Sequence, residues 1–129
     1  MDAVVFQMTD LLGEGKHAAA FAKLQQLLKM QQEPLSILGA VGAHFRRLGT
    51  AKSLLDAGKN ISALMELCGM SEYIAKKTIE ASRRFSLDFC RLSAELVAET
   101  DYKMKTSYDD PERLLELLML QLAQEARRG

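Results

Sequence analysis

The sequence predicts an all-α fold, a single compact bundle of about six or seven helices, and three observations support this prediction. Leucine, alanine and methionine are plentiful, whereas aromatic residues make up only 6% of the chain and tryptophan is absent, a composition that favours helices over strands. Apolar residues recur at helical spacing along most of the chain. Both prolines stand where a helix can begin. A chain of 129 residues can bury about two-thirds of its unfolded surface in one core, so we expect one domain over residues 1–129.

The first two expected helices cover about residues 3–12 and 17–31, and a glycine turn at Gly13–Gly15 separates them. This turn, followed by Lys16, invites comparison with a phosphate-binding loop. The comparison fails because His17 stands where that loop needs Ser or Thr, and no strand precedes the turn. We therefore interpret it as a connection between two helices.

The third expected helix is the longest and runs from Pro34 to about Ala57. Proline at the first helical position loses no hydrogen bond, and Gly58 provides an end. Gly39 and Gly42 lie inside this helix, where each lowers its stability by about 1 kcal/mol relative to alanine. We therefore expect another helix to cross very close to them. The apolar stripe comprises Leu35, Leu38, Val41, Phe45, Leu48 and Leu55.

Residues 58–86 predict two short helices joined by a tight turn. Asn60 and Ser71 are good N-caps, and Gly69 can adopt the left-handed conformation that ends the first helix. A helix, a glycine turn and a basic helix are typical of a DNA-reading helix-turn-helix. However, base-reading residues usually lie at the N-terminal end of the second helix, where Glu72 would repel phosphates. The apolar positions are Ile61, Leu64, Leu67 and Cys68 in the first helix, and Ile74, Ala75, Thr78, Ile79 and Ser82 in the second.

The sixth expected helix begins at the Ser86 cap and ends near Thr106, with Asp101 and Lys105 forming an i,i+4 ion pair. The seventh begins at Asp110–Pro111. It holds seven large apolar residues within nine positions, 114–122, which cover almost its whole circumference. Such a helix is either central or part of an interface. The candidate subunit-interface residues are Leu114, Leu115, Leu117, Leu118, Met119 and Leu122.

The formal net charge of zero argues against tight, purely electrostatic binding to nucleic acid and leaves room for one weak basic face. Ordinary solvated surface charge is the alternative interpretation of that face. No apolar run is long enough to span a membrane, and the start lacks a basic signal-peptide region. We expect a cytoplasmic protein in which Cys68 and Cys90 are buried free thiols. The candidate DNA-facing or partner-facing residues are Arg46, Arg47, Lys52, Lys76, Lys77, Arg83 and Arg84.

No pattern in the sequence indicates catalysis. His17 and His44 have no cysteine or carboxylate at metal-binding spacing, and no serine occupies a nucleophile turn. The seven methionines are interpreted as core residues. We therefore expect neither a catalytic site nor a metal or other cofactor.

Several blocks in order and spacing resemble the C-terminal collar domain of the DNA polymerase III delta subunit of bacterial clamp loaders. Glu72 departs from the usual proline, Gln32 from the usual glycine, and Leu64–Met65 from a common Ile-Ala. The matching blocks are Val5–Phe6 with Thr9–Asp10, Glu33–Leu38 (EPLSIL), Phe45–Leu48 (FRRL), Lys52–Leu55 (KSLL) with Gly58, Gly69–Lys77 (GMSEYIAKK), Ser82–Ser86 (SRRFS), Ala98–Asp101 (AETD) with Lys105, and Leu115–Leu118 (LELL).

The resemblance implies a scaffold rather than an enzyme. In this family, two N-terminal AAA+ modules contact the sliding clamp, and the C-terminal helical domain packs with its counterparts into a ring-shaped collar. This chain would be the collar domain alone, without those modules, within one component of the bacterial DNA polymerase III holoenzyme. Its partners would be the other clamp-loader subunits and, through the basic face, primer–template DNA. The apolar seventh helix would then contact both its own core and its neighbours.

Two other interpretations compete with this assembly domain. A helix-turn-helix DNA-binding regulator would bind specific sites in a salt-dependent way, and charge reversal at Lys76 and Lys77 would abolish that binding. A small helical enzyme ranks last because no residues support it.

Overall fold

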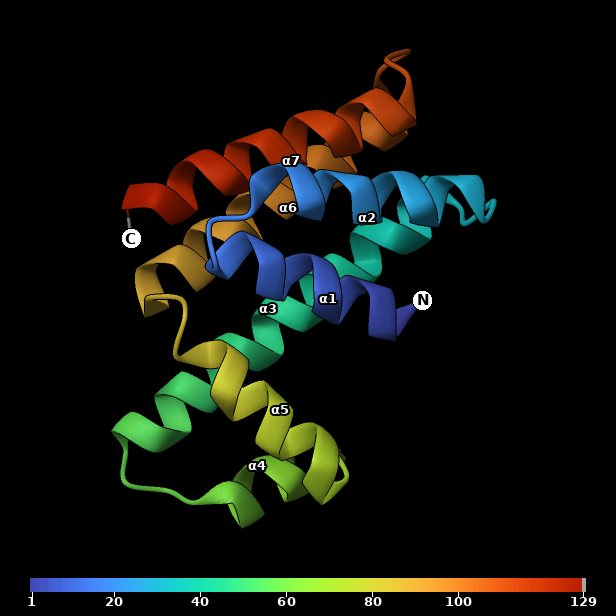
Figure 1. Ribbon diagram of the computed structural model, residues 1–129. Helices are drawn as coiled ribbons and strands as arrows, with labels where there is room; N and C mark the ends of the chain where they lie inside the picture. Colours follow the sequence, from blue (N-terminus) through green and yellow to red (C-terminus); the bar gives the residue numbers. More distant parts are fainter. Residues whose placement is uncertain (129) are drawn as a thin grey trace.

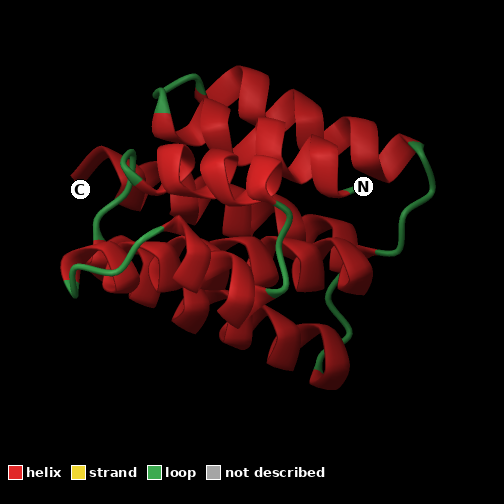
Figure 2. Cartoon of the chain, turned by 90° about the horizontal axis from the view of Figure 1, so that it is seen from below, coloured by secondary structure: helices red, strands yellow, loops and turns green. Residues whose placement is uncertain are grey.

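The computed structural model describes residues 1–128, in which there are seven helices and no strand (Figure 1). Short loops join the helices (Figure 2). The predicted all-α fold is confirmed. The helices are α1 (Asp2–Gly13), α2 (His17–Lys29), α3 (Pro34–Asp56), α4 (Ile61–Cys68), α5 (Glu72–Ser82), α6 (Leu87–Thr106) and α7 (Pro111–Arg128).

The predicted helix ends are confirmed because the residues that cap them act locally. The Asn60 side chain accepts a hydrogen bond from the Ala63 N–H at 3.2 Å, and Ser71 accepts one from the Ile74 N–H at 3.3 Å. Each bond satisfies a backbone donor that the first turn of a helix leaves unpaired. Gly69 ends α4 with φ 65°, a left-handed conformation that side-chain-bearing residues rarely adopt.

Helix α3 is the central element, because it packs against α1, α4, α5, α6 and α7. Its N-terminal half lies in the main core, where Phe45 is 1% exposed. The Phe45 ring centre lies 5.6 Å from that of Phe85 and 5.5 Å from that of Phe89, both edge-on, and Phe85 stacks on Phe89 at 4.9 Å. This aromatic cluster joins α3 to the start of α6.

A second, smaller core lies at the other end of α3, where α4 and α5 pack (Figure 1). Its buried residues are Ala51 of α3, Leu64 of α4 and Ala75 of α5. Half-buried residues such as Ile61 and Ile79 surround them. The two short helices therefore rest on α3 as a satellite of the main bundle.

Three leucines of the predicted apolar stripes lie on the surface. Leu35, Leu55 and Leu67 are 46%, 39% and 66% exposed. Leu35 and Leu55 lie in the first and last turns of α3, and Leu67 lies in the last turn of α4. Helical periodicity gives the direction of a side chain but not the point at which the neighbouring helix ends.

The expectation of a close helix crossing is confirmed for one glycine and wrong for the other. A Cβ atom added at Gly42 would lie 3.1 Å from Val97 Cγ1, so α6 does cross close to it. A Cβ added at Gly39 would meet nothing within 4 Å. The sequence did not indicate a close crossing at Gly49, where an added Cβ would lie 3.5 Å from Cys90 Cβ of α6.

Both cysteines are free, as predicted, with Cys90 buried and Cys68 only half-buried. Burial raises the pKa of the Cys90 thiol. Within residues 1–128, no helix is both long enough and apolar enough to cross a membrane.

Candidate functional site

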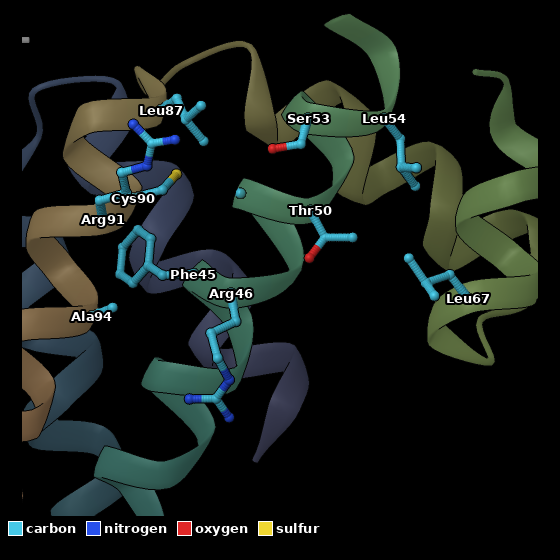
Figure 3. Close-up of a pocket in the computed structure, with 11 residues that line it drawn as sticks. Phe45, Arg46, Thr50, Ser53, Leu54, Leu67, Leu87, Cys90, Arg91 and Ala94 are labelled. Atoms are coloured by element: carbon cyan, nitrogen blue, oxygen red, sulfur yellow. The ribbon is translucent and has the colours of Figure 1, made fainter. Parts of the chain in front are cut away.

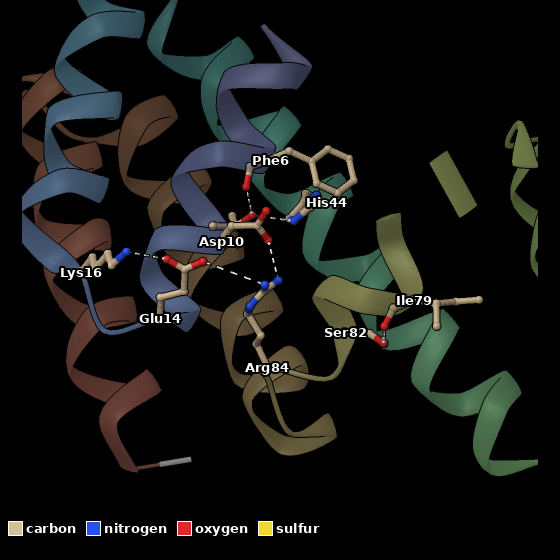
Figure 4. Close-up of polar contacts among 9 residues, drawn as sticks. Phe6, Asp10, Glu14, Lys16, His44, Ile79, Ser82 and Arg84 are labelled. Atoms are coloured by element: carbon tan, nitrogen blue, oxygen red, sulfur yellow. Dashed lines mark hydrogen bonds and ion pairs between the residues drawn. The ribbon is translucent and has the colours of Figure 1, made fainter. Parts of the chain in front are cut away.

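Three of the seven basic residues that were proposed to face DNA or a partner make contacts inside the fold. The Arg84 guanidinium lies 3.2 Å from the Asp10 carboxylate and 3.9 Å from that of Glu14, which joins the start of the α5–α6 loop to α1 (Figure 4). Burial raises the pKa of Asp10, although Arg84 acts in the opposite direction. These groups are about one-third exposed, so the ion pairs contribute modestly to stability.

Lys52 and Lys77 also serve the fold. Lys52 Nζ donates a hydrogen bond to the Ser82 carbonyl at 3.1 Å and so satisfies a backbone acceptor at the end of α5. Lys77 Nζ lies 4.9 Å from the Phe6 ring centre and 5.5 Å from that of Tyr73. A cation over aromatic rings at these distances is a cation–π contact.

The other four basic residues are exposed. Lys76 Nζ pairs with Glu72 at 3.3 Å within α5. No hydrogen bond or ion pair in the described part of the chain involves the side chains of Arg46, Arg47 or Arg83. These three arginines are therefore the basic residues available to bind a partner.

The geometry of α5 differs from that of a projecting recognition helix. It packs against both α3 and α4, and Lys77 reaches Phe6 of α1. Glu72 occupies its N-terminal turn, and Glu80 is also exposed. The exposed carboxylates would repel phosphates, and the lysines of this helix already contact other side chains of the chain. Helix α5 is therefore poorly suited to a DNA groove.

Five of the six candidate interface residues of α7 are buried in the chain itself, so they are not available as a surface. Leu117 is the exception, at 46% exposed, and Leu120 beside it is 57% exposed. A small hollow of about 200 Å³ adjoins them between α6 and α7. Helix α7 therefore has a buried apolar side and an exposed outer strip that consists of Leu117 and Leu120. The five buried residues, at 1–6% exposed, are Leu114, Leu115, Leu118, Met119 and Leu122.

Two open surface hollows lie between α3 and α6 and adjoin each other at Arg46 and Ala94. We call the pair the α3–α6 groove. The hollow of about 280 Å³ is lined by Leu35, Gly39, Val97 and Asp101, among others. The hollow of about 460 Å³, shown in Figure 3, is lined by residues that include Arg46, Thr50 and Leu54 of α3, Leu87 and Arg91 of α6, and Leu67 of α4.

His44 is buried and neutral. The Thr9 hydroxyl donates to the Phe6 carbonyl at 3.1 Å, so its oxygen is assigned to accept the hydrogen of His44 Nε2 at 2.7 Å (Figure 4). Burial, with a smaller contribution from the positive charge of Arg47, lowers the pKa of His44 to about 4. The ring also packs edge-on against Phe6 with centres 4.4 Å apart. These contacts describe a satisfied core histidine.

His17 accepts a hydrogen bond at Nδ1 from the Arg127 guanidinium at 3.2 Å, which joins the start of α2 to the end of α7. Within the described residues, no group of three His, Cys, Asp or Glu side chains is placed to hold a metal ion.

The α3–α6 groove and the exposed Leu120 of α7 were not predicted as surface features from the sequence. The signal for the groove was the set of small residues along both helices, such as Gly39 and Ala94, together with Arg91. Without the crossing angle of α3 and α6, however, small residues could not be assigned to an inner or an outer face.

Comparison with known proteins gives consistent results. A family model described as "DNA polymerase III delta subunit, C-terminal domain" matches residues 2–122. DNA polymerase III subunit delta of Bacillus subtilis (strain 168) is 28% identical over 118 residues, which cover 92% of this chain and 34% of that protein. The solved structure of the Bacillus subtilis DNA clamp loader delta protein matches with a TM-score of 0.90 and 27% identity, over 95% of this chain and 36% of that one. The chain thus spans about a third of the length of these relatives.

Proposed function

Because this chain belongs to the family of C-terminal domains of the DNA polymerase III delta subunit, we propose that it is a non-catalytic assembly domain of a bacterial clamp loader. In this role it packs with other clamp-loader subunits in a collar and so supports the loading of the sliding clamp onto primed DNA. The observation that carries the proposal is the family match over residues 2–122, together with a fold that matches a clamp loader delta protein at a TM-score of 0.90.

The roles of the full-length protein would be divided between its parts. The matched relatives are about three times as long as the stretch they share with this chain. We place nucleotide binding and contact with the sliding clamp in the N-terminal AAA+ modules of the family rather than in these 129 residues. The domain would contribute no catalytic group to the polymerase holoenzyme, would require no cofactor, and would act in the bacterial cytoplasm.

The outer strip of α7 supports a role in assembly. Leu117 and Leu120 lie one helical turn apart and are both about half exposed, beside a hollow between α6 and α7. Adjacent exposed leucines on a helix are suited to packing against a neighbouring helix. For contact with primer–template DNA, the proposed residues are reduced to Arg46, Arg47 and Arg83, since the other four candidates already have partners in the fold. The comparisons give no support to a helix-turn-helix regulator.

Co-purification with the other clamp-loader subunits tests this function. We expect the wild-type chain to be retained by them and the double variant Leu117→Glu/Leu120→Glu to bind at least tenfold more weakly, because two charges would have to be buried. Met30→Glu is the matched control, since Met30 is 51% exposed but lies after α2. Equal retention of the two variants would remove α7 from the interface.

A further inference from the structure

The α3–α6 groove is long enough to hold a helix. Along α3 its lining extends from Leu35 to Leu54, which corresponds to about 30 Å of helix at 1.5 Å per residue. The linings of the two hollows share Arg46 and Ala94, so the hollows adjoin each other between α3 and α6. Its dimensions match an elongated occupant better than a compact small molecule.

Gly39 indicates a close approach from outside the chain. It lies in the middle of α3, where glycine lowers helix stability by about 1 kcal/mol relative to alanine. Packing within the described chain does not require a glycine here, because a Cβ added at Gly39 would meet no atom within 4 Å. Gly42, one turn later, does lie against α6 of the same chain, because a Cβ added there would lie 3.1 Å from Val97 Cγ1. Gly39 instead lines the open groove, where the absence of a side chain leaves room for another backbone.

The charge of the larger hollow indicates the chemistry of the occupant. Its eleven lining residues include Arg46 and Arg91 and no carboxylate. Arg46 has no ion pair within residues 1–128, and Arg91 lies 3.8 Å from Asp88, with both side chains largely exposed. Leu67 of α4, at 66% exposed, lines the same hollow on the side near Leu54 (Figure 3). Arginine is enriched in protein interfaces, whereas lysine and the acidic residues are depleted there.

From these observations we propose that the α3–α6 groove receives an amphipathic helix from a neighbouring protein of the clamp loader. Carboxylates of that helix pair with Arg46 and Arg91, its apolar residues cover Leu67 and Leu87, and a small residue packs over Gly39. This inference rests on the proposed function and specifies the face and the partner chemistry. DNA fits the groove less well, because the lining around Phe45 is apolar and Asp101 lines the other hollow. Arg46 is thereby assigned to a protein partner, which leaves Arg47 and Arg83 as the residues proposed for contact with DNA.

Two variants of the full chain test the groove by titration with the other clamp-loader subunits. Gly39→Gln places a bulky, helix-favouring side chain in open space, so we expect the chain to fold with equal or higher Tm but to bind at least tenfold more weakly. Arg46→Glu/Arg91→Glu is expected to weaken binding at least tenfold, most strongly at low salt. Lys29→Glu is the control, since Lys29 is exposed in the last turn of α2 and lines neither hollow.

The outcomes separate the two proposals. If the wild-type chain binds and both groove variants bind equally well, the groove inference is wrong and the assembly function stands. Loss of primer–template DNA binding in Arg46→Glu/Arg91→Glu, with binding to the loader proteins unchanged, also overturns it. If the wild-type chain binds none of the other loader proteins, the proposed function fails and the groove inference fails with it.

Discussion

At the scale of single residues, His44 shows how burial sets a chemical property. Its side chain is held between α1 and α3 by the Thr9 hydroxyl and the Phe6 ring. Burial disfavours the charged imidazolium, and the positive charge of Arg47 adds to that effect, whereas Asp2 opposes it. The pKa of His44 therefore falls from the ordinary 6.5 to about 4. At neutral pH the ring is an uncharged part of the core.

This shift makes stability depend on pH in a defined direction. The unfolded chain binds the proton of His44 more tightly than the folded chain, so lowering the pH favours unfolding. The contribution is fully present above pH 6.5 and is lost as the pH falls from 6.5 to about 4, by about 3 kcal/mol in total. Burial raises the pKa of Asp10, which acts in the opposite direction as the pH falls. Urea unfolding at several pH values measures the sum of these effects.

His44→Gln isolates the histidine in that measurement. Glutamine has no titrating group in this range and can still donate a hydrogen bond to Thr9. We expect the difference in free energy of unfolding between wild type and variant to shrink as the pH falls below 6.5. Parallel pH profiles would show that His44 does not titrate differently in the folded state.

Residue-scale features were predictable where their cause is local. Asn60, Ser71 and Gly69 act within a few residues of the chain, and the structure confirms all three. Gly39 and Leu67 were misassigned because their surroundings depend on where distant helices cross and end.

At the scale of elements, α5 depends on a lysine from another helix. Lys52 of α3 donates to the Ser82 carbonyl at 3.1 Å, at the end of α5 that carries the partial negative charge of the helix dipole. A basic residue that was predicted to lie on a surface face therefore stabilises the packing of α5 on α3. No local pattern indicates this contact, because residues 52 and 82 are far apart along the chain.

Lys52→Met tests this role. Methionine keeps the apolar stem but cannot donate, so we expect the free energy of unfolding to fall by about 1–2 kcal/mol. Arg83→Met is the control, because Arg83 has no hydrogen bond or ion pair in the described chain and should change stability by less than about 0.5 kcal/mol. Thermal or urea unfolding measures both, and equal effects would contradict the assignment.

The seventh helix illustrates the same limit of prediction from sequence. Its apolar density correctly indicated that one side lies in the core. Which leucines remain outside depends on the packing of α7 against α1, α2, α3 and α6, and the structure leaves Leu117 and Leu120 exposed.

At the scale of the whole molecule, the two cores differ in size. The main cluster draws on α1, α2, α3, α6 and α7 and on Ala81 at the C-terminal end of α5, whereas the second has only Ala51, Leu64 and Ala75 as fully buried members. Local stability follows the buried apolar contacts that a segment makes. The α4–α5 satellite should therefore open more readily than the rest of the fold.

Native-state amide hydrogen exchange measures this difference. We expect amides of α4 and α5 to exchange through local opening, with lower free energies than those of α6 and the N-terminal half of α3. Equal protection of amides in all helices would contradict this prediction and would mean that α4 and α5 open only when the whole domain unfolds.

The fold class and helix boundaries were predictable because composition, periodicity and caps all act over short stretches. The surfaces were not, because the α3–α6 groove and the α7 strip exist only once the helices have crossed. The family resemblance supplied the proposed role, whereas the geometry indicates which residues are free to perform it.

The central claim is that this chain is an assembly domain, and the mass of the complex in solution tests it most directly. Light scattering after size-exclusion chromatography of the chain mixed with the other clamp-loader subunits should show a species that contains both. A mixture in which the chain elutes only at its own mass, 14.4 kDa, would contradict the claim.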